Sequence, residues 1–247
     1  MHRVLLALAA LLALAGPARA DPDALWKIVD QRCVPNTREY GEPKPCAKVD
    51  LAAGYVVLKD LVGDTQYLVM PTAKITGIED PAVLAAGTRN YFADAWAERH
   101  FTEDAAKRKL PRDALSLAVN SVSARSQNQL HIHVDCVRPD VRDALTRRQA
   151  AIGDAWAPFP VALAGQHYRA RLVAGETLDG ADPFRLVADG IPGAHAAMGR
   201  RTIVVVGLVL ADGRPGFAIL SDEADPATGD RAAGEDLQDH FCALAKE

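Results

Sequence analysis

The chain has 247 residues, of which 49% are hydrophobic and 24% are charged, and its formal net charge is −4 at pH 7. This length can bury a substantial core in one large domain or two small lobes. The acidic balance gives no support to nucleic-acid binding, which depends on Lys and Arg side chains that neutralise phosphates.

The first twenty residues have the pattern of a secretory signal. A basic start is followed by an apolar run over 4–15 and by the small-residue pattern Ala18-Arg19-Ala20. The apolar run is shorter than the roughly 20 residues that span a bilayer. We therefore expect cleavage before Asp21, with retention as a membrane anchor as the alternative, and an exported protein in either case.

The four cysteines are consistent with export, because disulfides persist in oxidising compartments. Cys33 and Cys46 bracket a loop rich in Pro, Gly and charge that has little apolar material to order it, and a disulfide would close this loop. Cys136 would then pair with Cys242. The spacing leaves open the other pairings and a free buried thiol at Cys136, and it does not match a zinc ribbon.

The first half of the chain predicts helices and strands in alternation. Residues 23–31 have the period of a short amphipathic helix, and the β-rich runs 54–59 and 66–70 flank a Gly63-Asp64 turn signal, which is typical of a hairpin. Aromatic residues at helical spacing predict a helix over 90–108, and residues 115–120 predict a strand.

The segment 127–136 carries the clearest chemical signal. Its polar members His131, His133 and Asp135 alternate with apolar residues at 130, 132 and 134, so on a strand they share one face. Two imidazoles and a carboxylate are costly to bury without a role. They suit phosphoryl transfer, acid–base chemistry or metal binding, since His-x-His presents two ligands and Asp135 a third.

The second half begins with a helical period after Arg138-Pro139. Residues 166–173, 202–210 and 216–220 predict strands, and residues 183–189 and 232–245 predict helices. A weak boundary near 156–160 divides the mature chain into a catalytic part, 21–156, and a C-terminal part of the same globular unit, 157–247. The fold class is α+β, an antiparallel sheet with helices packed on one side and the histidine strand in its centre.

Three pieces of the sequence resemble the histidine triad superfamily of nucleotide hydrolases and transferases. The run 66–71 is similar to that family's strand ending in proline, with Gln66 where the family usually has a nucleoside-contacting His. Asn120 and Gln127 have the family's seven-residue spacing just before the histidines, which a zinc site does not need. The resemblance implies a histidine-triad-like sheet, to which the C-terminal strands would add a second half, and it leaves monomer or homodimer undecided.

The same alignment places His131, His133 and Asp135 at the three triad positions, and it implies that His133 is the nucleophile. Most relatives have a third His at position 135, which can donate to phosphate, whereas an ionised Asp cannot. We expect Asp135 to orient an imidazole or to activate the hydrolytic water. Asn128 stands where many relatives have a small hydroxyl residue, and Arg125 is placed to meet phosphate charge or solvent.

The whole mature chain resembles the CDP-diacylglycerol pyrophosphatase family, a bacterial envelope branch related to these hydrolases. The resemblance rests on five segments, 24–29, 49–57, 75–79, 129–133 and 138–142. It extends through the C-terminal strands and Gln238-Asp239-His240. It implies hydrolysis of CDP-diacylglycerol to CMP and phosphatidic acid without a cofactor or metal, in the periplasm or at the periplasmic face of the inner membrane. CDP-diacylglycerol and the membrane surface are the expected partners.

The residues themselves allow this chemistry. A neutral imidazole is a nucleophile, and His133 would be largely neutral near pH 7 if its pKa stays near roughly 6.5. Attack on the phosphorus of the CMP half would give a CMP-histidine intermediate that water cleaves, with Asn120, Gln127 and His131 positioning phosphate. Two alternatives stay open. One is an exported, non-catalytic metal- or nucleotide-binding protein, and the other is a pyrophosphatase or nucleotidyltransferase for a soluble CDP ester.

Overall fold

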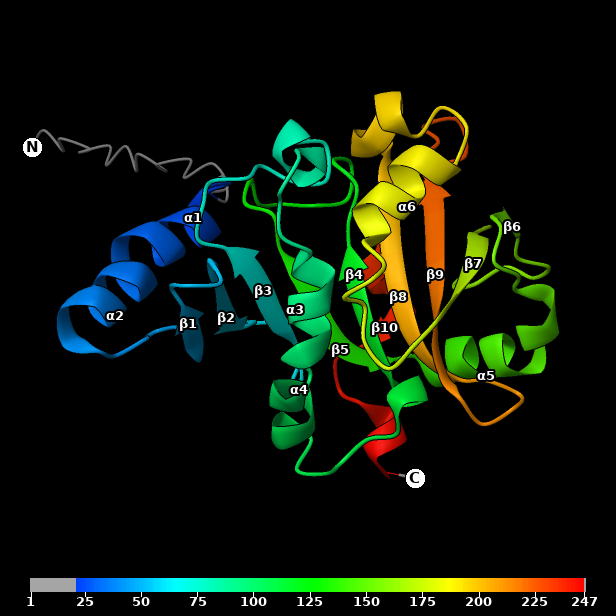
Figure 1. Cartoon of the computed structure of the whole chain (residues 1–247), viewed down its shortest axis with the longest axis horizontal. Coiled ribbons are helices and arrows are strands. Elements are labelled where there is room, and N and C mark those ends of the chain that lie inside the picture. The colour runs from blue at the N-terminus through cyan, green and yellow to red at the C-terminus, as the bar shows by residue number, and fades with distance from the viewer. Residues whose placement is uncertain (1–20, 247) are drawn as a thin grey trace, which may run out of the picture.

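A computed structural model describes residues 21–246, which form an α+β protein built on one ten-stranded sheet (Figure 1). The predicted signal at 1–20 lies outside the described residues. Nine strands follow the order β1-β2-β3-β5-β4-β8-β9-β7-β6, β10 pairs with β5, and all of these pairings are antiparallel. The strands are β1 Lys48–Asp50, β2 Tyr55–Lys59, β3 Tyr67–Pro71, β4 Leu115–Val119, β5 Ile132–Val137, β6 Ala157–Pro158, β7 Arg169–Ala174, β8 Arg201–Val209, β9 Pro215–Glu223 and β10 Gln238–Asp239.

The helices are short, and two of them differ from their predictions. The predicted helix 23–31 continues as one helical region to Tyr40, and the predicted helix 90–108 is interrupted at Glu98, which is buried and bonded to Tyr55. The α-helices are α1 Ala24–Ile28, α2 Val34–Tyr40, α3 Tyr91–Ala97, α4 His100–Ala105, α5 Pro139–Arg147 and α6 Pro183–Gly190. A π-turn, η1 Val29–Cys33, joins α1 to α2, and the 3-10 turns are η2 Pro81–Leu84, η3 Arg112–Ala114, η4 Gln149–Ala151, η5 His195–Arg200, η6 Gly234–Leu237 and η7 Ala243–Lys246.

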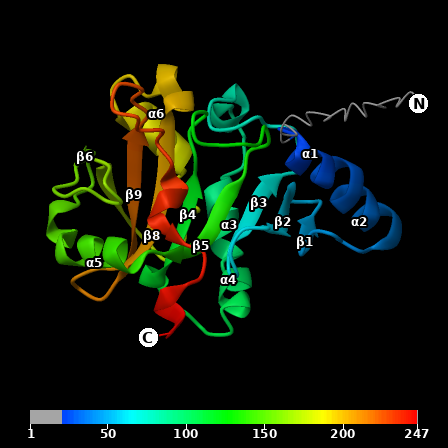
Figure 2. The ribbon, with the colours of Figure 1, turned by 180° about the vertical axis from the view of Figure 1, so that it is seen from behind.

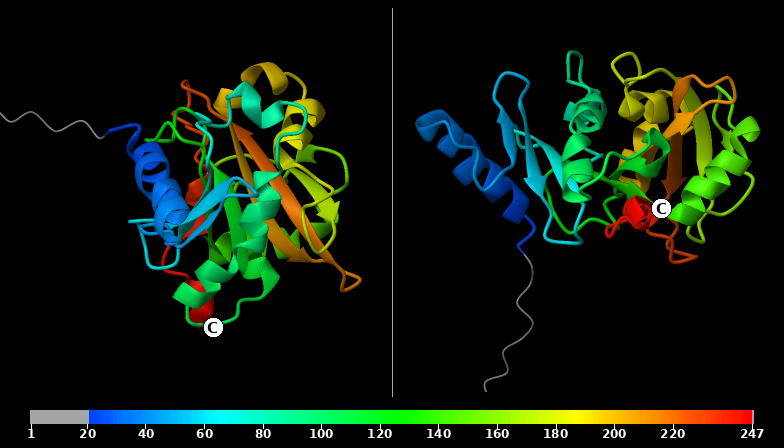
Figure 3. Two further views of the ribbon diagram at one scale, coloured as in Figure 1. Left: turned by 60° about the vertical axis from the view of Figure 1, so that its left-hand side comes forward. Right: turned by 90° about the horizontal axis from the view of Figure 1, so that it is seen from below.

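Both faces of the sheet are covered, whereas we expected helices on one side only. Successive residues of β2 alternate between two apolar clusters: Val57 joins the large core under α3 and α6, and Val56 joins a smaller cluster with Val29 and Val34 of the N-terminal helices. The N-terminal helices have an apolar stripe of their own, and burying it against β2 and β3 covers the second face. The right-hand view of Figure 3 shows α3 and the residues near the C-terminus on opposite sides of the sheet.

The C-terminal strands extend the same sheet, since residues 203–206 of β8 pair with β4 and the whole of β8 pairs with β9. The predicted helix over 232–245 is wrong. Residues Gln238 and Asp239 pair with β5 instead, and Cys242 has a left-handed backbone (φ +47°) where it forms a disulfide with Cys136. Strand pairing and this covalent bond override the local helical period in that segment.

The structure contains two disulfides, Cys33–Cys46 and Cys136–Cys242, with Cα–Cα distances of 5.6 and 5.3 Å. The first joins the N-terminal helices to the loop before β1, and the second joins β5 to the C-terminus. Both are consistent with an exported protein. Within residues 21–246, no helix has the length and apolar character needed to cross a bilayer.

Candidate active site

The histidine strand β5 lies between β3 and β4 in the middle of the sheet. His133 stands opposite Leu68 of β3 and Ala118 of β4, while Ile132 and Val134 turn into the large core. Directly opposed residues of an antiparallel pair project to the same side. His133 therefore lies on the face of Leu68, which is the face that also carries the N-terminal helices, and the predicted alternation is confirmed.

The ring of His131 is held in one orientation by the backbone. Its Nδ1 lies 2.6 Å from the carbonyl oxygen of Gln129, which is fixed in turn because its own amide donates to the carbonyls of Pro71 and Ala73. A carbonyl only accepts, so Nδ1 carries the proton and Nε2 keeps a free lone pair. Burial, and then the charge of nearby His133, lowers the pKa of His131 to about 4, so the ring is neutral near pH 7.

The ring of His133 has the opposite arrangement of donor and acceptor. The amide Nε2 of Gln66 lies 2.9 Å from His133 Nδ1 and 3.4 Å from a carboxylate oxygen of Glu235. The carboxylate only accepts, so this atom of Gln66 is the amide nitrogen and donates to Nδ1. A neutral His133 then carries its proton on Nε2, and burial lowers its pKa.

The Nε2 atom of His133 makes no hydrogen bond within residues 21–246. It is buried, and its nearest charged neighbour is a carboxylate oxygen of Glu235 at 3.6 Å. A buried donor without a partner is costly. Because His133 lines a cavity, this N–H is available to donate to an oxygen of a bound ligand.

Asp135 is fully buried and uses both carboxylate oxygens. Oδ1 accepts from Thr65 Oγ1 at 2.6 Å and from the backbone N–H of Cys136, and Oδ2 lies 2.8 Å from His240 Nδ1. Asp135 thus contacts an imidazole, that of His240, and its predicted role of orienting an imidazole or activating water stays a prediction. No group of three or more His, Cys, Asp or Glu side chains is arranged as metal ligands in the described part of the chain.

The two histidines open onto a cavity of about 540 Å³. One wall is polar and is formed by His131, His133, Asn120, Gln127 and Glu235. Apolar side chains from α1 and the β2–β3 hairpin complete the lining beside these polar groups: Leu25, Ile28, Leu58, Leu61, Val62 and Leu68. A cavity of this size with a few convergent polar groups fits a small-molecule site.

Three of the predicted substrate-binding residues line the cavity, and each of them already has a partner within the protein. Asn120 lines the cavity and donates to Glu235, and Gln127 lines it while its amide bonds the start of α1. Arg125 also lines the cavity, but both of its terminal nitrogens contact the carboxylate of Glu79.

Two of the predicted residues do not line the cavity. Gln66 is fully buried behind His133, so it supports that ring and has no exposed atom for a nucleoside. Asn128 contacts Arg125 through Oδ1 at 3.5 Å.

Sequence reasoning missed Glu235 and His240. Both lie in the segment that was predicted as a helix, and neither has a companion at motif spacing. Two signals for His240 were available: the family resemblance, which includes Gln238-Asp239-His240, and the Cys136–Cys242 pairing, because a bond to the residue after Asp135 brings His240 near that carboxylate.

Comparisons with known proteins are consistent with this site. The profile described as CDP-diacylglycerol pyrophosphatase matches residues 20–246. A protein of Yersinia pestis named CDP-diacylglycerol pyrophosphatase is 42% identical over 225 residues, which cover 91% of this chain and 86% of the relative. The match therefore includes both the histidine strand and the C-terminal segment.

Proposed function

The chain belongs to the CDP-diacylglycerol pyrophosphatase family, and we propose that it hydrolyses its substrate through a covalent CMP-histidine intermediate. The enzyme is a hydrolase that converts CDP-diacylglycerol to CMP and phosphatidic acid. The observation that carries the proposed mechanism is the hydrogen bond between His131 Nδ1 and the Gln129 carbonyl. It leaves a neutral imidazole with its Nε2 lone pair directed away from the backbone, which is the form that attacks phosphorus.

The hydrogen bonds favour His131 as the nucleophile, whereas the family resemblance implied His133. Nε2 of His131 attacks the phosphorus of the CMP half, the bond from that phosphorus to the bridging oxygen breaks, and phosphatidic acid leaves with the electron pair. The positive charge on the modified ring is stabilised by the Gln129 carbonyl. His133 donates its Nε2–H to a phosphoryl oxygen, where charge develops.

The fold supports a relation to the histidine triad superfamily, because the hairpin, the Asn120 strand and the histidine strand are adjacent in one antiparallel sheet. Asp135 departs from the triad because it faces His240 and not the phosphate site. The proposed donors to the substrate phosphates are therefore His133 and the second amide hydrogen of Asn120.

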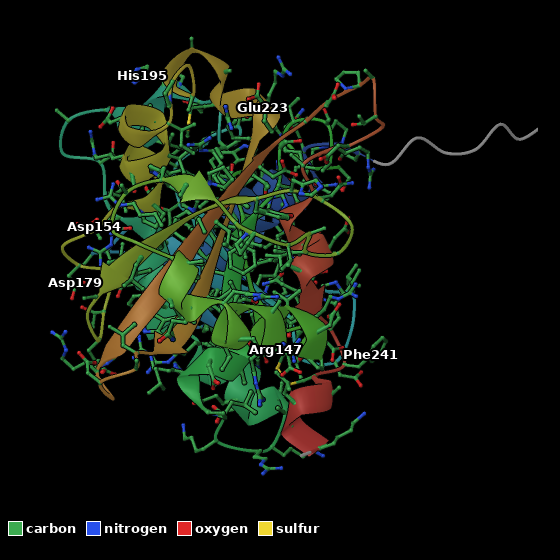
Figure 4. All side chains as sticks on the ribbon, turned by 90° about the vertical axis from the view of Figure 1, so that its right-hand side faces the viewer. Arg147, Asp154, Asp179, His195, Glu223 and Phe241 are labelled. Carbon is green, nitrogen blue, oxygen red and sulfur yellow. A yellow bond between two sulfur atoms is a disulfide. The ribbon has the colours of Figure 1, made fainter. Side chains whose placement is uncertain are left out.

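We also propose that the enzyme works at the periplasmic face of a membrane. Three large apolar side chains near the cavity are exposed: Leu61 is 100% exposed, Val62 54% and Phe241 63%. Leu61 and Val62 line the cavity, and Phe241 follows His240, whose carbonyl accepts from Asp64 and Thr65 of the turn that carries Leu61 and Val62. Figure 4 shows Phe241 at the surface. Exposed apolar side chains that rim a site indicate contact with a lipid surface. We call these three residues the apolar rim.

The mechanism is tested by CMP release from CDP-diacylglycerol micelles in excess chelator. His131→Gly should be inactive and should regain CMP release when free imidazole is added, because imidazole can occupy the place of the missing ring and attack in its stead. His133→Gly should lose activity without this rescue, since its role is to donate. Rescue of His133→Gly alone would assign the nucleophile to His133, and an active His131→Gly without imidazole would refute the covalent route through His131.

A further inference from the structure

The segment 235–242, which we call the C-terminal segment, crosses the face of the sheet that carries the histidines (Figure 2). It brings Glu235 beside His133 and His240 beside Asp135, across sequence separations of more than 100 residues. These are charged, titratable side chains whose contacts with the active site are not accounted for by the attack of His131 on phosphorus.

The backbone of this segment is held tightly at His240. Its carbonyl oxygen accepts from the N–H of Asp64 at 2.8 Å and of Thr65 at 3.3 Å. A Cβ at Gly63 would come within 2.3 Å of the His240 Cβ, so the close approach requires glycine there, and φ at Gly63 is +67°. Two residues later, Cys242 is bonded to Cys136. The position of the His240 ring is therefore built into the fold.

The ring of His240 lies between two carboxylates. Nδ1 donates to Asp135 Oδ2 at 2.8 Å, and Nε2 lies 3.5 Å from Glu235 Oε1. The hydrogen bond to Asp135 raises the pKa of His240, which favours an imidazolium that interacts with both carboxylates. A neutral ring with its proton on Nδ1 would direct a lone pair at Glu235.

Glu235 is fixed from two sides. Asn120 donates to its Oε2 at 2.9 Å and accepts from its backbone N–H at 3.1 Å, while His240 faces the other oxygen. Burial opposes ionisation, but the charge of His133 and the amides of Asn120 and Gln66 outweigh it and hold the pKa of Glu235 below its usual value. Glu235 is thus an ionised carboxylate that lines the cavity beside both histidines.

We propose that Glu235 is the general base that activates the hydrolytic water, and that the Asp135–His240 pair positions it. This inference rests on the proposed covalent mechanism. After phosphatidic acid has left, a water attacks the phosphorus of the CMP-histidine intermediate and passes a proton to Glu235. The phosphorus–nitrogen bond breaks, its electron pair returns to Nε2 of His131, and Glu235 releases the proton to solvent when CMP leaves. In histidine triad relatives a third His occupies position 135. This chain has Asp135 there, and His240 brings an imidazole to the Asp135 carboxylate from a distant segment.

The test is rapid-quench kinetics with CDP-diacylglycerol in mixed micelles, with phosphatidic acid and CMP measured separately. Glu235→Gln keeps the size of the side chain and removes the base. It should retain a burst of phosphatidic acid close to one per enzyme and release CMP on the order of 100-fold more slowly, since a general base contributes that much or more. Glu235→Asp, which keeps the charge but retracts it, should give an intermediate rate of CMP release.

His240→Gln tests the positioning role. It should lower kcat roughly tenfold with KM unchanged, because a displaced base affects the chemical step and not binding. The double variant Glu235→Gln/His240→Gln should be no slower than Glu235→Gln alone, because the second change acts only through the first. His195→Gln is the matched control, since His195 is an exposed histidine paired with Asp189 at a distance from the C-terminal segment (Figure 4).

Two outcomes would overturn the inference while leaving the covalent mechanism intact. The first is release of CMP by Glu235→Gln at the parental rate. The second is loss of the phosphatidic acid burst together with CMP release in a Glu235→Gln variant that melts like the parent protein. A different result, in which the parent shows no burst and His131→Gly is not rescued by imidazole, would refute the covalent mechanism itself.

Discussion

Replacing His131 by Asn should change how the stability of the protein depends on pH. The Asn amide can still donate to the Gln129 carbonyl, but it does not titrate. In the folded protein the pKa of His131 is lowered to about 4, first by burial and then by the charge of His133. In the unfolded chain its pKa returns to roughly 6.5. Between these values the unfolded chain binds a proton that the folded protein excludes, so stability falls as the pH is lowered through this window.

The expected size follows from the two pKa values. At pH 7 the His131 ring is mostly neutral in both the folded and the unfolded state, so its titration hardly changes the free energy of unfolding. At pH 5 the unfolded state is nearly fully protonated and the folded state is not, which lowers the free energy of unfolding by about 2 kcal/mol. Below pH 4 the effect levels off. His131→Asn lacks this contribution and should lose about 2 kcal/mol less than the parent between pH 7 and pH 5.

Urea denaturation followed by tryptophan fluorescence at the two pH values measures the difference directly. Carboxylates and other histidines titrate in both proteins, so they cancel in the comparison. His195→Asn, at an exposed histidine, should follow the parent. Equal losses of stability in His131→Asn and the parent would mean that the folded protein protonates this ring near pH 5, and the argument for a neutral nucleophile fixed by Gln129 would fail.

Two further predictions concern the disulfides and the apolar rim. Removing the Cys136–Cys242 disulfide by double Ala substitution should cost about 5 kcal/mol and removing Cys33–Cys46 about 3 kcal/mol, because the first closes the longer loop. Urea denaturation measures both, and only the first should abolish CMP release, so equal activity losses would contradict the role of the C-terminal segment. Leu61→Ser/Val62→Ser should reduce sedimentation with anionic phospholipid vesicles, whereas Val209→Ser, at an equally exposed site on β8, should not. Unchanged vesicle binding in the double variant would exclude these two residues as the membrane contact.

The elements with strong local periodicity were predicted well. The hairpin, the strand 115–120 and the helix after Arg138 are found close to their predicted bounds, whereas the histidine strand begins only at Ile132, after His131. In each of these the alternation of side chains and the turn residues agree with the tertiary structure. The segment 232–245 is different, because its backbone conformation depends on strand pairing with β5 and on a bond from Cys242 to Cys136. Neither interaction leaves a periodic signal in the segment itself.

The chemical roles divide in the same way. The spacing of His131, His133 and Asp135 was enough to place His133 and Asp135 on a strand, with His131 directly before it, and to indicate phosphoryl transfer. The sequence could not say which ring nitrogen carries the proton, because that depends on the Gln129 carbonyl for one ring and on the Gln66 amide for the other. Tautomers are set by hydrogen-bond partners, and one of these partners is 67 residues away.

The amino-acid sequence by itself determined the family, the central histidine strand and the pairing that the four cysteines favour, because these depend on residue type and on spacing along the chain. Only the tertiary structure brought Glu235 beside His133 and His240 beside Asp135. These contacts join segments more than 100 residues apart. The geometry of these contacts is set by the register of β10 on β5 and by the Cys136–Cys242 disulfide. The local sequence around Glu235 and His240 carries no information about either interaction.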